Sequence, residues 1–222
     1  MKNLQTKIDE GRQYRNAQDF RTEESENEEM IVEGYASTFN EEYELYSMNE
    51  DGINYRFFET VDPHAFDECD MSDVIMQYDH EGRVLARTRN NTLQITTDEH
   101  GLKVRADLSK SALGRGLYED IKNGIVDRMS FGFTITGDTN EKEHTEDGMK
   151  FLRTITQVGK LFDVSAVSFP ANEGTEISAR NYINGLIDVE KAERLEQAEK
   201  ELRRKKLLLK VRVAKKGERH GN

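Results

Sequence analysis

The chain lacks several features that mark well-known classes of protein. Its single cysteine, Cys69, excludes an intramolecular disulfide framework. The neighbouring acids at Asp67, Glu68 and Asp70 favour a plain thiol over a reactive thiolate. The five histidines are scattered, and none shows the i, i+4 spacing of a helical zinc pair. No glycine-rich phosphate loop is present either, so we expect neither a metal nor another cofactor.

Long apolar runs are also missing. No segment approaches the roughly 18 consecutive apolar residues that a membrane-spanning helix requires. Residues 1–10 contain no apolar stretch of the signal-peptide type. These absences predict a protein that is made and kept in a cytoplasm and has no membrane partner.

Charge is abundant, but it is distributed unevenly. The net formal charge is −11, and charged residues make up 34% of the chain. Residues 31–179 hold 14 basic and 28 acidic side chains, whereas residues 180–222 hold 13 basic and 7 acidic ones. The acidic body argues against nucleic acid as its partner, while the basic end suits an acidic surface or a partner protein.

Composition predicts three parts along the chain. Residues 1–29 are polar and end in an acidic run, which is typical of a flexible acidic arm. Residues 30–179 contain the strand-like runs and form the predicted central domain. Residues 180–222 are rich in helix-forming residues, so we expect a basic helical C-terminal extension.

The predicted extension has weak coiled-coil character. Leu195, Leu202 and Leu209 are seven residues apart, as in a coiled-coil heptad. The second position of each heptad should also be apolar, but charged residues occupy most of the places where it would fall. Leucines at 207, 208 and 209 make the helix apolar all round at that point. Self-association through residues 180–213 is one expectation, and a solvated helical tail is the other.

The central domain reads as mainly β. Short apolar or alternating runs predict about seven strands. Seven of these runs are Ile31–Ala36, Val74–Tyr78, Leu93–Thr97, Leu102–Ala106, Arg128–Ile135, Phe151–Ile155 and Leu161–Phe169, and Arg56–Glu59 is a further candidate for a short strand.

The segments between these runs complete the expected fold. Residues 43–54 and 137–148 read as loops, and Gly159 marks a bulge or a tight bend. One clear helix starts after Ser109 or Ser111 and ends near Gly124. An α+β fold follows, with an antiparallel barrel or sandwich and helices outside it.

Ser130 is the strongest candidate for a nucleophile. Met129, Phe131 and Phe133 share one face of the predicted strand, and Ser130 shares the other face with Gly132. The missing side chain at Gly132 leaves room over the serine for a substrate carbonyl. The alternative is an outward-facing strand serine that happens to lie beside a glycine.

His80 is the strongest candidate for a general base. It directly follows a predicted buried strand and precedes Glu81 and Gly82, so it lies at a strand-to-loop junction. Its unperturbed pKa near ~6.5 suits proton transfer at neutral pH. The alternative is a surface loop histidine, and His64, which also follows a turn, competes for the role.

Asp163 is the candidate that would orient the base. It lies within the apolar run Leu161–Val167, where a buried carboxylate is costly unless it is paired. Orienting an imidazole would offset that cost. The alternative is an outward-facing residue of an alternating strand. Ser165 and Ser168 are rival nucleophiles, but no glycine stands near them.

Four stretches of the chain resemble the phage prohead (capsid maturation) serine protease family. They are Val32–Ala36 with Phe39 and Asn40; Glu59 with Pro63–Phe66; Asp79 and His80 with Val84–Arg87 and Gly101–Leu102; and Met129–Phe133 with Leu161–Ser165 and Phe169–Asn172. The resemblance covers about residues 30 to 180. His80 precedes Ser130 by 50 residues, and Asp163 follows Ser130 by 33.

The resemblance implies a fold and a site. The family is related in fold to the herpesvirus assembly proteases, so it implies an antiparallel β-barrel wrapped by helices. It also implies that His80 is the base and Ser130 the nucleophile. Asp163 would orient the base, in a position that the family commonly gives to Glu.

The resemblance further implies a serine endopeptidase of capsid assembly. Such a protease cleaves scaffold protein or the scaffolding arm of the major capsid protein, and often itself, inside the assembling prohead in the host cytoplasm. The alternative is a catalytically inactive scaffold or assembly protein that retains the fold. An ordinary intracellular serine hydrolase is a third option, but the chain lacks the Gly-x-Ser-x-Gly elbow of the common type.

Overall fold

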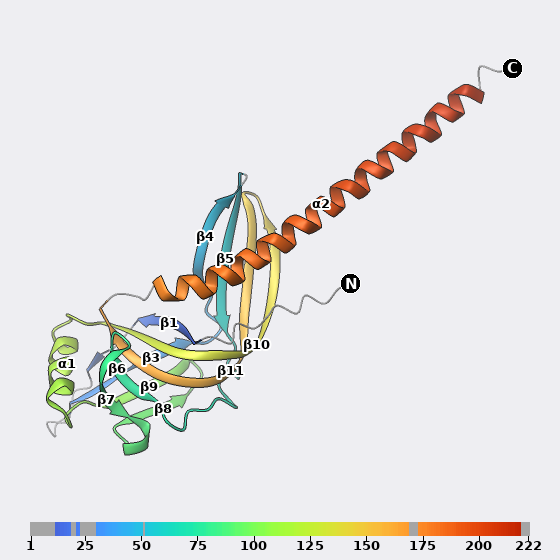
Figure 1. Cartoon of the computed structure of the whole chain (residues 1–222). Helices are drawn as coiled ribbons and strands as arrows, with labels where there is room; N and C mark the ends of the chain where they lie inside the picture. The colour runs from blue at the N-terminus through green and yellow to red at the C-terminus, as the bar shows by residue number, and fades with distance from the viewer. Residues whose placement is uncertain (1–11, 19–20, 23–29, 51, 169–172, 219–222) are drawn as a thin grey trace. The chain divides into compact units, whose positions relative to one another are not determined.

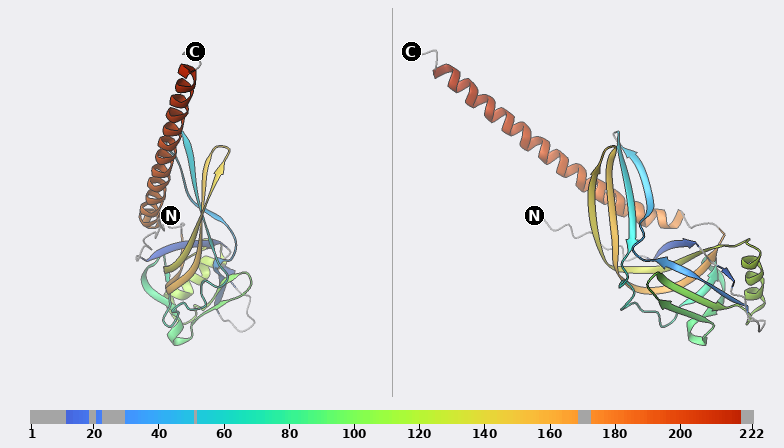
Figure 2. Two further views of the ribbon diagram at one scale, coloured as in Figure 1. Left: turned by 90° about the vertical axis from the view of Figure 1, so that its right-hand side faces the viewer. Right: turned by 180° about the vertical axis from the view of Figure 1, so that it is seen from behind.

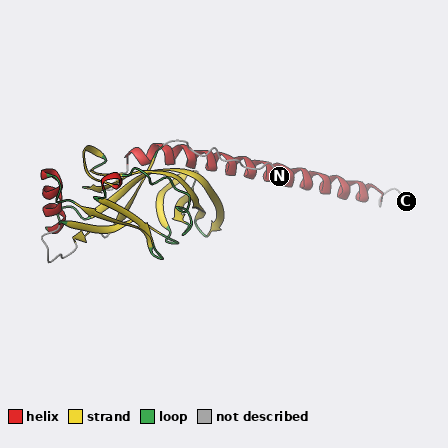
Figure 3. Ribbon diagram, turned by 90° about the horizontal axis from the view of Figure 1, so that it is seen from below, coloured by secondary structure: helices red, strands yellow, loops and turns green. Residues whose placement is uncertain are grey.

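The computed structural model describes residues 12–18, 21–22, 30–50, 52–168 and 173–218. The chain divides into two compact units, Met1–Ala179 and Arg180–Asn222. Strands dominate the first unit, and helix dominates the second, as the colouring by secondary structure in Figure 3 makes clear.

The first unit contains eleven strands among the described residues. They are β1 (Gln13–Gln18), β2 (Arg21–Thr22), β3 (Ile31–Thr38), β4 (Tyr43–Glu50), β5 (Ile53–Val61), β6 (Ile75–Tyr78), β7 (Glu81–Arg87), β8 (Leu93–Thr97), β9 (Gly101–Asp107), β10 (Arg128–Thr145) and β11 (Gly148–Val167). A short 3₁₀ helix, η1 (Thr88–Asn90), and helix α1 (Ala112–Lys122) join them. Helix α2 (Glu173–Glu218) makes up the C-terminal part.

The strands form two sheets. The larger has seven strands in the order β1-β10-β11-β5-β4, with β6 also paired to β11 and β7 paired to β6. The smaller has four strands in the order β2-β3-β9-β8. The α+β class is therefore confirmed. Neither sheet closes on itself through hydrogen bonds, so the described strands do not show the expected barrel (Figure 1).

The hydrophobic core joins the two sheets to α1. It includes Val32 of β3, Val104 of β9, Phe131 of β10 and Val164 of β11, and α1 contributes Leu117. All five side chains are at most 5% exposed. The sequence placed these residues on apolar faces, and burial of those faces drives the sheets together.

Two segments expected as loops are instead strands. Residues 43–50 form β4 and residues 53–54 begin β5, while residues 137–145 continue β10 and residue 148 begins β11. Figure 2 shows these parts of β4, β5, β10 and β11 as neighbouring strands that extend away from the rest of the first unit. Most side chains at the β10 end are exposed, so the segment lacks the alternation of apolar and polar residues on which strand prediction relies.

Two local predictions are confirmed. Ser111 caps α1 by accepting a hydrogen bond from the Gly114 amide, and Gly124 follows the helix with a positive φ of 68°. Gly159 lies at a bulge, since Thr134 pairs with Lys160 while the next residue of β10 pairs with Val158.

The N-terminal segment differs from the expected flexible arm. Residues 13–18 form β1, which pairs antiparallel with β10, and residues 21–22 form β2. The rest of residues 1–29, except for residue 12, lies outside the described residues. Short polar strands of this kind depend on a partner strand that is distant in sequence, so composition does not reveal them.

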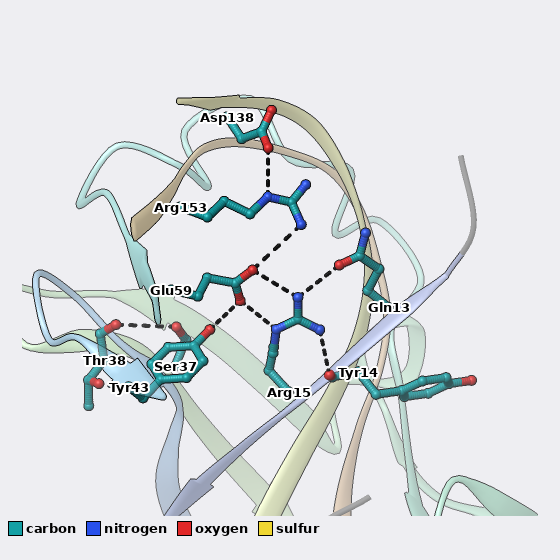
Figure 4. Close-up of polar contacts among 9 residues, drawn as sticks. All are labelled: Gln13, Tyr14, Arg15, Ser37, Thr38, Tyr43, Glu59, Asp138 and Arg153. Atoms are coloured by element: carbon teal, nitrogen blue, oxygen red, sulfur yellow. Dashed lines mark hydrogen bonds and ion pairs between the residues drawn. The ribbon is translucent and has the colours of Figure 1, made fainter. Parts of the chain in front are cut away.

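A buried ion-pair cluster links β1 to β5 and β11 within the larger sheet (Figure 4). The Glu59 carboxylate, which is fully buried on β5, accepts hydrogen bonds from the Arg15 guanidinium on β1. It also accepts one from the Tyr43 hydroxyl at 2.5 Å, and Arg153 Nη1 lies 3.6 Å from its Oε2. Arg153 Nε in turn donates to Asp138 Oδ2 at 2.6 Å. Each buried charge in the cluster therefore has an opposite charge beside it.

The cluster sets the ionisation of its members. Burial by itself would raise the pKa of the Glu59 carboxyl, but the charge and hydrogen bonds of Arg15 hold it below its ordinary value. Burial raises the pKa of Tyr43 well above its ordinary value, so its hydroxyl stays protonated and can donate. The Arg15–Glu59 pair thus links β1 to β5, which is not its neighbour in the sheet.

Candidate active site

Three elements position the candidate residues. Ser130 lies on β10, Asp163 on β11, and His80 in the turn between β6 and β7. In the antiparallel pairing of β10 with β11, Gly132 lies opposite Asp163, two residues from Ser130. β6 pairs with β11 on its other side, in parallel, with Ile75 opposite Asp163. The chain's order of strands therefore brings three distant segments to one point.

The three side chains form a continuous chain of hydrogen bonds. His80 Nε2 lies 2.7 Å from Ser130 Oγ, and His80 Nδ1 lies 2.5 Å from Asp163 Oδ1. An ionised carboxylate can only accept, so Nδ1 carries the proton toward Asp163. Nε2 is then free to accept the Ser130 hydroxyl proton. The candidate base thus contacts both the candidate nucleophile and the candidate orienting residue.

Asp163 is buried but well supported. Its side chain has no exposed surface, and its Oδ1 also accepts a hydrogen bond from Ser165 Oγ at 2.9 Å. The Arg12 guanidinium forms an ion pair with Oδ2. These contacts stabilise a carboxylate that would otherwise be costly in an apolar strand.

His80 is adapted to remain neutral. Burial lowers its pKa to about 4, the positive charge of Arg12 acts in the same direction, and the nearby Asp79 carboxylate opposes them. The Tyr14 ring packs edge-on against the imidazole, with 4.4 Å between the ring centroids. At neutral pH the imidazole is therefore in the form that can accept a proton.

Gly132 makes room for the carboxylate. A Cβ at this position would lie 2.6 Å from Asp163 Oδ2 and 2.6 Å from Arg12 Nε. Real Cβ atoms essentially never approach other atoms so closely. We predicted that the space beside Gly132 would admit a substrate carbonyl. The Arg12–Asp163 pair instead occupies that space, on the face of β10 that Ser130 and Gly132 share.

The rival residues have other partners. His64 is 82% exposed at its side chain and pairs with Asp67, at 3.0 Å from Nδ1 to Oδ2. Ser165 hydrogen-bonds to Asp163, and Ser168 to Tyr78 and Asp79. Ser130 is thus the candidate serine in contact with the imidazole. It is also fully buried, which excludes the alternative of an outward-facing serine.

Cys69 is not an activated nucleophile. Burial raises the pKa of this half-buried thiol to about 11, and the neighbouring Asp70 acts in the same direction. At neutral pH the thiol therefore stays protonated, in agreement with the plain thiol expected from its acidic neighbours.

Sequence analysis missed two residues that line the site. Arg12 and Tyr14 belong to the segment that we expected to be flexible, and both lie against the candidate triad. Their only signal in the sequence is a basic and an aromatic residue in a polar stretch. Such a signal has no meaning until β1 is paired with β10.

Two further searches concern the described residues alone. Within the ranges that the structure describes, no group of three or more His, Cys, Asp or Glu side chains is arranged to hold a metal ion. Among those same ranges, no helix is both long enough and apolar enough to cross a membrane.

Similarity to known proteins agrees with the chemistry of this site. A serine, a histidine and an aspartate in one chain of hydrogen bonds are typical of serine hydrolases. The family model described as Caudovirus prohead serine protease matches residues 17–186, and this chain belongs to that family.

One curated relative supports the same assignment. The chain is 28% identical over 167 residues to a protein named prohead protease, from Enterobacteria phage HK97. The matched part covers 70% of this chain and 62% of that relative, which is less than two thirds of its length. No solved structure matches the chain significantly.

Proposed function

We propose that this chain is a serine endopeptidase of phage capsid assembly. It would cleave scaffold protein or the scaffolding arm of the major capsid protein, and itself, inside the assembling prohead in the host cytoplasm. The observation that carries the proposal is the contact of His80 with both Ser130 and Asp163. Membership of the prohead serine protease family supports it.

The proposed reaction uses the three residues in sequence. Neutral His80 accepts the Ser130 proton through Nε2 while Oγ attacks the substrate carbonyl carbon. Asp163 holds the imidazole in place through Nδ1 and stabilises the imidazolium that forms. His80 then gives the proton to the leaving amine, which leaves an acyl-enzyme on Ser130. In the second step His80 accepts a proton from the attacking water and returns it to Ser130 Oγ as the acyl group leaves. General-base assistance of this kind contributes roughly 10²–10⁴-fold to the rate.

Access to the serine requires a movement in this mechanism. Ser130 has no exposed surface, and β1 runs along the edge of β10 with Asn16 in register with Ser130. A substrate carbonyl can reach Oγ only after the cover over the serine shifts. β1 is well placed to be that cover, because Tyr14 of this strand contacts His80. When β1 moves, Glu59 still has Tyr43 and Arg153 beside it.

We propose separate roles for three parts of the chain. Residues 30–179 would form the protease domain, and residues 1–29 an arm that reaches the site through β1. Residues 180–222 would be a basic helical extension that contacts scaffold or capsid protein, or a second copy of this chain.

Co-expression with the major capsid protein of the same phage tests the function. The wild-type chain should generate defined capsid-protein and self-cleavage fragments by mass spectrometry, and Ser130→Ala should generate none. His80→Ala should also abolish cleavage, because it removes the proposed base. His64→Ala is its matched control, since it removes an exposed histidine, and it should leave cleavage unchanged. Identical fragments from wild type and Ser130→Ala would refute the protease. No fragments from either would favour the inactive assembly protein.

A further inference from the structure

The turn that carries His80 has an unusual backbone. Tyr78 pairs with Glu81 across the β6–β7 hairpin, so Asp79 and His80 are the two residues of the turn. Their φ angles are 49° and 58°, both in the left-handed region. Two successive positive φ angles define a turn in which Asn-Gly or Asp-Gly is preferred. His80 therefore occupies a position that favours glycine.

The left-handed conformation is unfavourable for a residue with a Cβ, so something must hold His80 there. Asp79 is suited to the first position of the turn, since Asp adopts this conformation more readily than most residues. A turn residue chosen only for its backbone preference would need no distant partner. Asp79 nevertheless has one.

The Asp79 carboxylate is bound to the residue that follows β11. Oδ1 accepts a hydrogen bond from the Ser168 amide at 2.8 Å, and Oδ2 accepts one from Ser168 Oγ at 3.1 Å. The Asp79 amide donates to the Ala166 carbonyl at 2.9 Å. The turn is thus tied by three bonds to the end of the strand that carries Asp163.

This connection fixes the candidate base relative to the carboxylate that orients it. β11 also pairs with β10, where Ser165 lies opposite Ser130. β11 is therefore the common reference for all three members of the triad. His80 reaches it through its own hydrogen bond to Asp163 and through the turn that Asp79 holds.

We propose that Asp79 is a positioning residue for the reaction. By binding Ser168, its carboxylate holds the left-handed turn against β11 and so keeps His80 between Ser130 and Asp163. The proposal rests on the proposed protease function. Asp79 is not a catalytic residue, because it contacts none of the reacting atoms.

Three variants separate the effect of the Asp79–Ser168 contact, here called the clamp, from the effects of turn conformation and of charge. Asp79→Gly keeps and even favours the left-handed backbone but removes the clamp. Asp79→Asn keeps a side-chain oxygen for the Ser168 amide and removes the charge. Asp98→Gly is the matched control, because Asp98 caps the β8–β9 hairpin through the amides of His100 and Gly101, away from the triad.

The assay is labelling of the full-length chain with a fluorophosphonate probe, which reads Ser130 activation without an identified substrate. We expect Asp79→Gly to lower the maximal labelling rate about 10- to 100-fold with little change in probe affinity, since an ångström of misplacement costs about that much. Asp79→Asn should stay within about 5-fold of wild type, and Asp98→Gly within about 2-fold, on the same reasoning.

The pH profile supplies a readout that a merely structural role would not move. His80 faces Tyr14 of β1 and Arg12 just before it, Asp163 of β11, Ser130 of β10, and Asp79 in its own turn. Removing the negative charge of Asp79 removes an influence that raises the pKa of His80. The acidic limb of the labelling rate should therefore move to lower pH in Asp79→Asn, while the maximal rate is largely kept.

The possible results are distinct. Wild-type labelling of Asp79→Gly, or equal loss in Asp79→Asn and Asp79→Gly, would overturn the positioning role. If Asp79→Gly does not fold, Ser168→Ala decides, because it removes the Oγ bond to Asp79 at an exposed residue and should slow labelling several-fold, with Tyr78→Phe as the control for the Tyr78 hydroxyl contact that is lost with it. Unchanged labelling of Ser130→Ala would instead refute the proposed function itself.

Discussion

Replacing Gly132 with alanine tests how closely the site is packed around Asp163. The added Cβ would lie 2.6 Å from Asp163 Oδ2, whereas ordinary contact begins at 3.4 Å. Arg12 is long and can move aside, but Asp163 is short, fully buried and held by His80 and Ser165. The carboxylate must therefore move by about 0.8 Å to relieve the contact.

A displacement of this size affects the reaction more than binding. Misplacement by about 1 Å costs as much as 100-fold in rate, so we expect a 10- to 100-fold fall, equal to about 1.4–2.7 kcal/mol in the barrier. The fall should appear in kcat on a capsid-protein substrate, with KM changed less than about 3-fold, because the substituted position touches the orienting carboxylate.

The control and the contrary result are both accessible. Gly116 has nothing within 4 Å of its Cβ position on α1, so Gly116→Ala should leave kcat unchanged and stabilise the helix by up to about 1 kcal/mol. A Gly132→Ala variant with wild-type kcat would refute the packing argument. A rise in KM alone would instead support the idea that Gly132 makes room for the substrate.

Three further predictions concern burial, pH and access. Arg15→Ala removes the main partner of a buried carboxylate but leaves Tyr43 and Arg153 beside it, so the free energy of unfolding in denaturant should fall by about 1.5–3 kcal/mol, and a change below about 0.5 kcal/mol would refute a stabilising role for the cluster. Because burial and Arg12 lower the pKa of His80 to about 4, kcat/KM should persist well below pH 6.5 and fall only near pH 4. Arg12→Ala should move that acidic limb to higher pH, and a shift to lower pH would contradict the assigned charge effect. A cysteine pair at Gln18 and Arg128, which lie opposite each other, should when oxidised lock β1 and slow cleavage at least tenfold relative to the reduced form, in a background without the native thiol. Equal rates in both redox states would show that β1 need not move.

The sequence determined the features that depend on local pattern. Apolar faces at period 2 predicted β8, β9 and the inner half of β10, a short apolar run predicted β3, and Ser111 and Gly124 marked α1. The same patterns placed Ser130 and Asp163 within buried strands. Family resemblance, rather than spacing, ordered these residues with His80, and the structure puts the three in contact.

Only the tertiary structure decided which polar segments are strands and what surrounds the candidate triad. β1, β4 and the outer half of β10 are polar, and they become strands because distant partners supply their hydrogen bonds. Arg12 and Asp79 gain their roles from pairing across many residues, which leaves no local pattern. Gly132 illustrates the difference: the sequence shows that a side chain is absent, and the fold shows that the space belongs to Asp163.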